Sequence, residues 1–188
     1  MIEVHDGETV EVTDCDTATV FDGGEVVVLM LGHAVVRDGG HATVEAHGYA
    51  EVLVGGQATV HDGGKAEVLD GGWADVLDGG LVDVSAGGKA RVHEGGKAWV
   101  HAGGRAVVQD GGKALVRKGG TAEVYDGGRA VVFEGGRAEV FKNGFAEVQD
   151  GGKAHVHTGG EIENYGDDSL IEFDDYDDTV ADDLAPSI

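Results

Sequence analysis

The chain has 188 residues, a formal net charge of −23 and 35 glycines against a single proline. Glycine enrichment without proline or serine enrichment excludes a collagen triple helix and a flexible linker. The strong negative charge disfavours binding to nucleic acid or to an anionic membrane surface, and favours a basic partner. The only cysteine, Cys15, excludes an intramolecular disulfide bond.

The first residues have neither the basic region nor the apolar region of a secretory signal peptide. The longest apolar run, residues 26–31, is far too short to span a bilayer. We therefore expect a cytoplasmic protein that has no membrane segment.

Acidic residues are concentrated at the two ends. Residues 1–36 contain eight acidic residues and no Lys or Arg, whereas residues 37–160 contain 17 acidic and 13 basic residues. Residues 161–188 contain 11 acidic residues and no base. A basic partner would therefore be attracted to the ends rather than to the nearly balanced middle.

An octapeptide repeat, x-A-x-V-x-D-G-G, runs through residues 1–160 without an insertion. Every residue numbered by a multiple of eight from 24 to 160 is Gly, in 18 cases of 18. Val occupies every eighth position from 4 to 156, in 20 cases of 20, and Ala lies two positions before it in 16 of these. A fixed period of this kind is typical of a solenoid, in which stacked repeats bury what a single repeat cannot.

Each octad predicts a short strand and a tight turn. Ala and Val, two positions apart, face the same side of a strand, while the residues between them face water. Asp-Gly-Gly predicts a turn, because Asp accepts a hydrogen bond from the backbone two residues on and Gly tolerates positive φ. A helix is excluded, since two glycines per octad would cost it about 2 kcal/mol relative to alanine. The predicted fold class is an all-β parallel β-solenoid.

Two coil sizes are compatible with the period. Three octads per coil would enclose a wide interior suited to Leu, Ile or Phe, whereas two octads give a thin, two-sided core suited to Ala and Val. The first Gly of the pair is replaced at Cys15, Leu31, His47 and Asn143, which all fall on one edge if a coil has two octads. We therefore favour 16 residues per coil, and ten coils would make a rod of about 48 Å.

Residues 161–188 depart from the repeat and are expected to form an acidic C-terminal cap or tail, following the solenoid of residues 1–160. Apolar residues in this segment, Leu170, Ile171, Phe173 and Tyr176, could cover the open end of the solenoid while the carboxylates repel further coils. Binding of a partner by this acidic segment is the alternative, and the two roles are compatible.

No catalytic constellation is present, so we expect neither an enzyme nor a cofactor. The Asp residues of the turns could form a calcium ladder, but calcium-binding solenoid repeats have another length, and turn capping explains the same residues. His155 and His157 form a His-x-His pair that has no third ligand in sequence, so no metal site is predicted.

Large apolar residues often follow the Val. They either pack at the corners of the coil or form a face for self-association. Examples are Phe21, Leu29, Leu53, Leu69, Leu77, Tyr125, Phe133 and Phe141.

The run G-G-x-A-x-V, seen at residues 63–68 and throughout residues 1–160, resembles the Gly-Gly-rich repeats of AIDA-type autotransporter passenger solenoids. That resemblance implies a solenoid with an adhesive role. In architecture the chain is also similar to pentapeptide-repeat proteins, some of which imitate duplex DNA with rows of surface carboxylates.

The leading functional hypothesis is a non-enzymatic acidic decoy or inhibitor of a basic, nucleic-acid-binding protein, of the kind met in anti-restriction or anti-CRISPR systems. Direct nucleic-acid or membrane binding is not expected. The alternative is a structural or adhesive rod that self-associates into a homo-oligomer. The contact residues expected for the decoy are Glu3, Glu8, Glu11, Asp14, Asp16, Asp167, Asp168, Glu172, Asp174, Asp175, Asp177, Asp178, Asp182 and Asp183.

Overall fold

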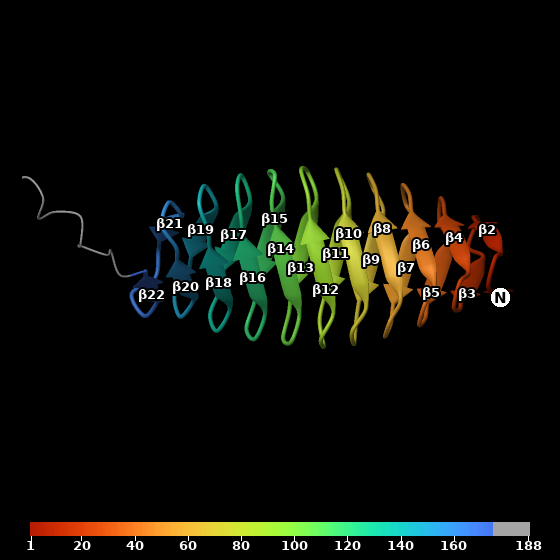
Figure 1. Ribbon diagram of the computed structural model, residues 1–188, viewed down its shortest axis with the longest axis horizontal. Coiled ribbons are helices and arrows are strands. Elements are labelled where there is room, and N and C mark those ends of the chain that lie inside the picture. The colour runs from red at the N-terminus through yellow and green to blue at the C-terminus, as the bar shows by residue number, and fades with distance from the viewer. Residues whose placement is uncertain (175–188) are drawn as a thin grey trace, which may run out of the picture.

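A computed structural model describes residues 1–174 and shows a flat, two-sided parallel β-solenoid (Figure 1). The odd-numbered strands form one 11-stranded sheet and the even-numbered strands form the other. No helix occurs among residues 1–174, so none there is long and apolar enough to cross a membrane.

The first sheet consists of β1 (Ile2–Val4), β3 (Thr17–Val20), β5 (His33–Val36), β7 (Tyr49–Val52), β9 (Lys65–Val68), β11 (Leu81–Val84), β13 (Lys97–Val100), β15 (Lys113–Val116), β17 (Arg129–Val132), β19 (Phe145–Val148) and β21 (Glu161–Asn164). The second consists of β2 (Thr9–Val12), β4 (Glu25–Val28), β6 (His41–Val44), β8 (Gln57–Val60), β10 (Trp73–Val76), β12 (Lys89–Val92), β14 (Arg105–Val108), β16 (Thr121–Val124), β18 (Arg137–Val140), β20 (Lys153–Val156) and β22 (Leu170–Phe173).

Each coil contains two octads, as the thin Ala/Val core predicts. Strand β9 pairs with β11 in a register that sets Ala66 beside Val82 and Val68 beside Val84, 16 residues further along the chain. Every strand therefore lies on the equivalent strand of the next coil. Ten strand spacings of about 4.8 Å give a rod of roughly 48 Å.

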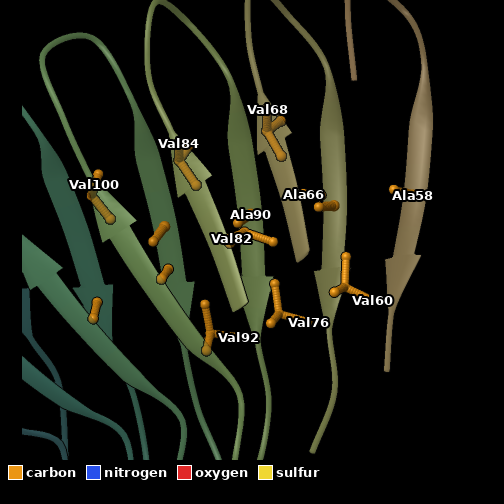
Figure 2. Packing of buried hydrophobic residues seen from close by; sticks show 14 of the residues in the cluster. Ala58, Val60, Ala66, Val68, Val76, Val82, Val84, Ala90, Val92 and Val100 are labelled. Carbon is orange, nitrogen blue, oxygen red and sulfur yellow. The ribbon is translucent and has the colours of Figure 1, made fainter. Parts of the chain in front are cut away.

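The core lies between the two sheets and is made almost entirely of the Ala and Val columns. From Ala18 to Val156 these side chains are 0–3% exposed, and Figure 2 shows them pointing into the space between the sheets. In the first coil, Ile2 is 37% exposed and Val10 is only partly buried. Burial of small side chains in every coil is the main stabilising term of such a stack.

The two glycines of each turn are required for different reasons. A β-carbon on Gly72 would lie 2.6 Å from the carbonyl oxygen of Val52, so the second position excludes every side chain. Gly71 has a φ of +86° and open space around its α-carbon, so the first position needs a left-handed backbone rather than room. This difference explains why, from residue 24 to residue 160, only the first slot accepts other residues, Leu31, His47 and Asn143, which keep a positive φ as Cys15 does. In the first coil the second slot holds Glu8 and Asp16.

The turn Asp side chains do not act as the predicted caps. The amide of Gly24 donates to the carbonyl oxygen of Phe21 at 2.9 Å, and the amide of Gly23 donates to Gly39 in the next coil at 3.1 Å. The hydrogen bond within the turn and the one between coils occupy these two amides, so neither can donate to the Asp22 carboxylate. The carboxylate instead lies against the α-carbon of Gly39. In the described part of the chain, Asp150 is the one turn Asp that accepts a backbone hydrogen bond, from Asp168 in the next coil.

The two sheets continue beyond residue 160. Strands β21 and β22 form an eleventh coil, in which Ile162 and Ile171 pack against the core. One residue is inserted before β22, because Lys153 pairs with Leu170. Leu170 and Phe173, two of the residues expected to cover the open end, are 47% and 62% exposed, and Tyr176 lies outside the described residues.

Candidate functional site

Outward side chains form columns along the rod, and two kinds of contact join neighbouring coils. Residues in the same column stack directly, as the rings of His33 and Tyr49 do, with centroids 5.2 Å apart. Residues 18 apart meet diagonally: the hydroxyl of Tyr49 donates to Glu67 at 3.0 Å, and Nε2 of His101 donates to Asp83 at 3.0 Å. Burial and the neighbouring Glu67 carboxylate raise the pKa of Tyr49 to about 12.

A ladder of three rings runs along the edge of the second sheet near the C-terminal end. The rings of Tyr125 and Phe141 are parallel with centroids 4.4 Å apart, and Phe141 stacks on His157 at 4.3 Å. Tyr125 and Phe141 are 16 residues apart, so the predicted coil of 16 residues sets them in one column, and this is confirmed. The stack fixes the plane of the His157 ring, whose Nε2 is buried and has no hydrogen-bond partner among the described residues. Its Nδ1 edge is therefore the one available to a neighbour.

The ring ladder ends on a carboxylate that two imidazoles share. Nε2 of His155 donates to one oxygen of Asp174 at 2.9 Å, and Nδ1 of His157 donates to the other at 3.0 Å. Nδ1 of His155 lies 3.6 Å from the Glu172 carboxylate. The hydrogen bond to Asp174 raises the pKa of His155, and the same bond lowers the pKa of Asp174.

Sequence reasoning missed Asp174 as a neighbour of the His-x-His pair because the inserted residue hides the register of the last coil. The sequence did contain a signal for this contact. Ile171 and Phe173 are two positions apart, like Ala154 and Val156, and aligning these pairs sets Asp174 beside His157.

The acidic residues expected at the N-terminal end all lie exposed on the first coil and its turns: Glu3, Glu8, Glu11, Asp14 and Asp16. Among residues 1–174, the one basic side chain near these carboxylates is His5, whose ring lies 3.7 Å from Glu3. The backbone amide of His5 also donates to Glu8 at 2.8 Å. The structure therefore gathers these carboxylates on one end of the rod.

The acidic residues expected at the C-terminal end are only partly available. Glu172 and Asp174 contact histidines of the preceding coil, and Asp167 and Asp168 form the turn before β22. The remaining residues of that set lie outside the described residues: Asp175, Asp177, Asp178, Asp182 and Asp183.

Sequence reasoning also missed two columns of basic residues. Eight of the 13 Lys and Arg residues occupy the first position of a strand, four on each sheet: Lys65, Lys97, Lys113 and Arg129 on the first, and Lys89, Arg105, Arg137 and Lys153 on the second. Within residues 1–174, only Arg91 and Arg129 among the Lys and Arg residues form ion pairs. The faces of the middle coils thus carry rows of cations among their carboxylates, which opposes imitation of a polyanion along the whole rod.

Three exposed apolar residues, Met30, Leu31 and Val54, lie in turns of the N-terminal coils. These coils are red to orange in Figure 1. In the turn after β4, Met30 and Leu31 are 60% and 59% exposed and occupy slots that hold Asp and Gly in the repeat. We call this turn the apolar knob.

The opposite edge carries an apolar hollow of about 570 Å³, formed by the turns after β3, β5 and β7. It is lined by Phe21, Leu53 and Val54 and by three charged residues, Asp22, Arg37 and Asp38. Val54 is 58% exposed and again takes the place of the usual turn Asp. The knob and the hollow therefore lie on opposite edges, within the second to fourth coils.

No protein-family model and no curated protein matches the chain. Among solved structures, the crystal structure of a TibC-catalysed, hyper-glycosylated TibA fragment is similar, with 24% identity, a TM-score of 0.41, and coverage of 92% of this chain and 91% of that one. Because the identity and the TM-score are low, function is inferred from the surface of this chain alone.

Proposed function

We propose that the chain is a non-enzymatic structural rod that associates side by side with further copies of itself. The observation that carries this proposal is the pairing of an apolar knob on one edge with an apolar hollow at a similar height on the other. This function corresponds to the self-associating rod of the sequence analysis rather than to the acidic decoy.

The apolar knob contains a strained backbone conformation that the fold of a single rod does not require. Leu31 has a φ of 62°, a left-handed conformation that costs a residue with a side chain roughly 1–2 kcal/mol. Gly fills this slot in most repeats, and here a strained backbone displays a large apolar side chain to water. A partner surface that covers Leu31 and Met30 would offset both costs.

The hollow fits the knob of a second copy. Phe21, Leu53 and Val54 offer apolar surface, and the turn Asp that would place a charge there is replaced by Val54. Because knob and hollow lie on opposite edges, the contact joins two different surfaces and leaves one knob and one hollow free. Such a heterologous contact, repeated by translation, builds an open row of parallel rods.

Charge repulsion opposes this packing. Residues 1–36, which include the knob, contain eight acidic residues and no Lys or Arg, so neighbouring N-terminal coils repel each other. Salt screens repulsion between exposed charges but does not weaken apolar contacts. Association should therefore strengthen as the ionic strength rises, the opposite of a complex held by ion pairs.

The test is sedimentation velocity over a range of protein and salt concentrations. Leu31→Gly and Val54→Asp each restore the repeat residue, and we expect both variants to remain monomeric where the original chain associates. Asn143→Gly restores the same slot near the other end and serves as the matched control. A chain that stays monomeric at every concentration and salt level, or a control that loses association equally, would contradict the proposal.

A second candidate is binding of a basic protein at the first coil, favoured by the exposed carboxylates of Glu3, Glu8, Glu11, Asp14 and Asp16. Replacing these five with Gln or Asn should then abolish binding of a lysine-rich peptide, whereas Glu123→Gln with Glu139→Gln should not. A deletion that tests the acidic tail should begin at residue 175, because β21 and β22 belong to the two sheets. Equal peptide binding by all of these variants would exclude this candidate.

A further inference from the structure

We propose that His155, His157 and Asp174 form a binding site for a divalent transition-metal ion, Zn²⁺ above all, which fastens the eleventh coil to the tenth. The site is independent of the knob and the hollow, which lie on the N-terminal coils. It is built from two strands whose positions the parallel ladder already fixes, β20 and β22.

The three side chains converge on one point. One ligand atom from each of them lies within 4.8 Å of the other two. The two nitrogen-to-oxygen distances to Asp174 are 2.9 and 3.0 Å. In a tetrahedral zinc site, with metal–ligand distances of about 2.0–2.2 Å, neighbouring ligand atoms are roughly 3.3 Å apart. Binding an ion thus requires the two nitrogen–oxygen pairs to move apart by a few tenths of an ångström, and any pair of ligand atoms near the 4.8 Å limit to close by up to about 1.5 Å.

Neighbouring groups hold both imidazoles in an orientation suited to a metal. His157 is stacked on Phe141 at 4.3 Å, which directs Nδ1 toward Asp174. His155 directs Nε2 toward Asp174, and its other nitrogen lies 3.6 Å from Glu172. A metal-bound His commonly donates its second N–H to a carboxylate, and Glu172 is placed to accept it.

The donor set selects the kind of ion. Two imidazole nitrogens and one carboxylate suit Zn²⁺ and other transition metals, whereas Ca²⁺ and Mg²⁺ prefer oxygen ligands. Asp174 is exposed, so water can reach the site and supply a fourth ligand. The neighbouring groove of about 450 Å³ is lined by His155 and Glu172 but by neither His157 nor Asp174.

The chain contains a matched pair that lacks the third ligand. His101 and Asp83 meet diagonally at 3.0 Å, the same kind of contact between neighbouring coils as His155 and Asp174. In the described part of the chain, the three residues of the proposed site form the only group of three or more His, Cys, Asp or Glu side chains whose ligand atoms converge in this way. His101→Gln is therefore the control for any effect of losing one imidazole.

Calorimetric titration of the full chain with ZnCl₂ tests the site. We expect one tight site, weakened about tenfold or more by His155→Gln, by Asp174→Asn and by His157→Phe, which keeps the ring stack. The His101→Gln variant should bind as tightly as the original chain, and MgCl₂ should not compete. Equal zinc affinity in the original chain and the three variants, or equal weakening in the control, would overturn the proposal.

A second measurement does not depend on how well the variants fold. In the unsubstituted chain, zinc should shift the imidazole NMR resonances of His155 and His157 and leave those of His33 unchanged. Zinc should also slow hydrogen exchange of the β22 amides if the ion joins the eleventh coil to the tenth. Shifts spread equally over all histidines would refute the site, and unchanged exchange in β22 would refute its fastening role.

Discussion

The middle coils and the N-terminal coils share one backbone and one core but differ in their turns. From Gly55 to Gly135 the first slot of every turn is Gly, whereas the N-terminal coils place Cys15, Leu31 and His47 there. The inward Val column is the same in both regions and is fully buried. The Val column therefore repeats without exception from residue 4 to residue 156, while the turn slots that packing leaves open carry residues that distinguish one coil from another.

The largest expected effect is the steric cost of placing a side chain at the second glycine of a turn. In a middle coil, Gly72→Ala forces a β-carbon against the carbonyl oxygen of Val52 and should lower the free energy of unfolding by about 3 kcal/mol. Gly71→Ala meets no atom within 4 Å and pays only for its left-handed φ, about 1 kcal/mol. Urea unfolding followed by circular dichroism compares the two. Equal losses would show that the second slot is not sterically closed.

The next largest effect is the loss of stability when Val is replaced by Ala, which should be greater inside the rod than at its end. Val100→Ala removes two methyl groups from a closed core and should cost about 2 kcal/mol. Val10→Ala removes the same groups from the half-buried first coil and should cost less than about 1 kcal/mol. The unfolding midpoints of the two variants measure the difference. A loss of stability at Val10 as large as that at Val100 would mean that Val10 is packed as tightly as a residue inside the rod.

Much of the fold could be predicted from the sequence because the repeat encodes local rules. The spacing of Ala66 and Val68 gives the strand and its inward face, and the small core gives the 16-residue coil. The turns were less predictable: Asp22 looked like a cap, but the ladder between coils already uses the amides it would need. That competition depends on the neighbouring coil and cannot be read from one octad.

The candidate sites, like the fold, could be predicted from the sequence only in part. The exposure of Met30 and Val54 follows from their turn slots, yet their grouping into a knob and a hollow depends on which edge each turn occupies. The meeting of His157 with Asp174 depends on a single inserted residue before β22, which the period of eight does not predict.

A smaller effect is the gain in stability when a left-handed residue in the first turn slot is replaced by Gly. Leu31→Gly relieves a left-handed residue and should raise the free energy of unfolding by up to about 1 kcal/mol while it removes self-association. Asn143→Gly should raise it less, because Asn tolerates this conformation better. Thermal unfolding at low protein concentration measures both. A destabilised Leu31→Gly variant would show that Leu31 supports the fold rather than a contact.

The smallest effect concerns one diagonal contact, Tyr49 with Glu67. The pKa of Tyr49 is raised to about 12, so the folded chain holds the phenol proton more tightly than the unfolded chain does. This contribution to stability is fully present below about pH 10 and is lost as the pH rises through about 12. Glu67→Gln should lower the pKa of Tyr49 in an ultraviolet absorbance titration. An unchanged titration would remove Glu67 as a cause.

The central claim, that knob and hollow belong to one heterologous contact, is tested most directly by mixing two variants. Leu31→Gly lacks the knob but keeps the hollow, and Val54→Asp lacks the hollow but keeps the knob. Each alone should sediment as a monomer, while the mixture should form a one-to-one dimer and nothing larger, because only one complete contact is left. A mixture that remains monomeric, or variants that each still form larger assemblies, would contradict the claim.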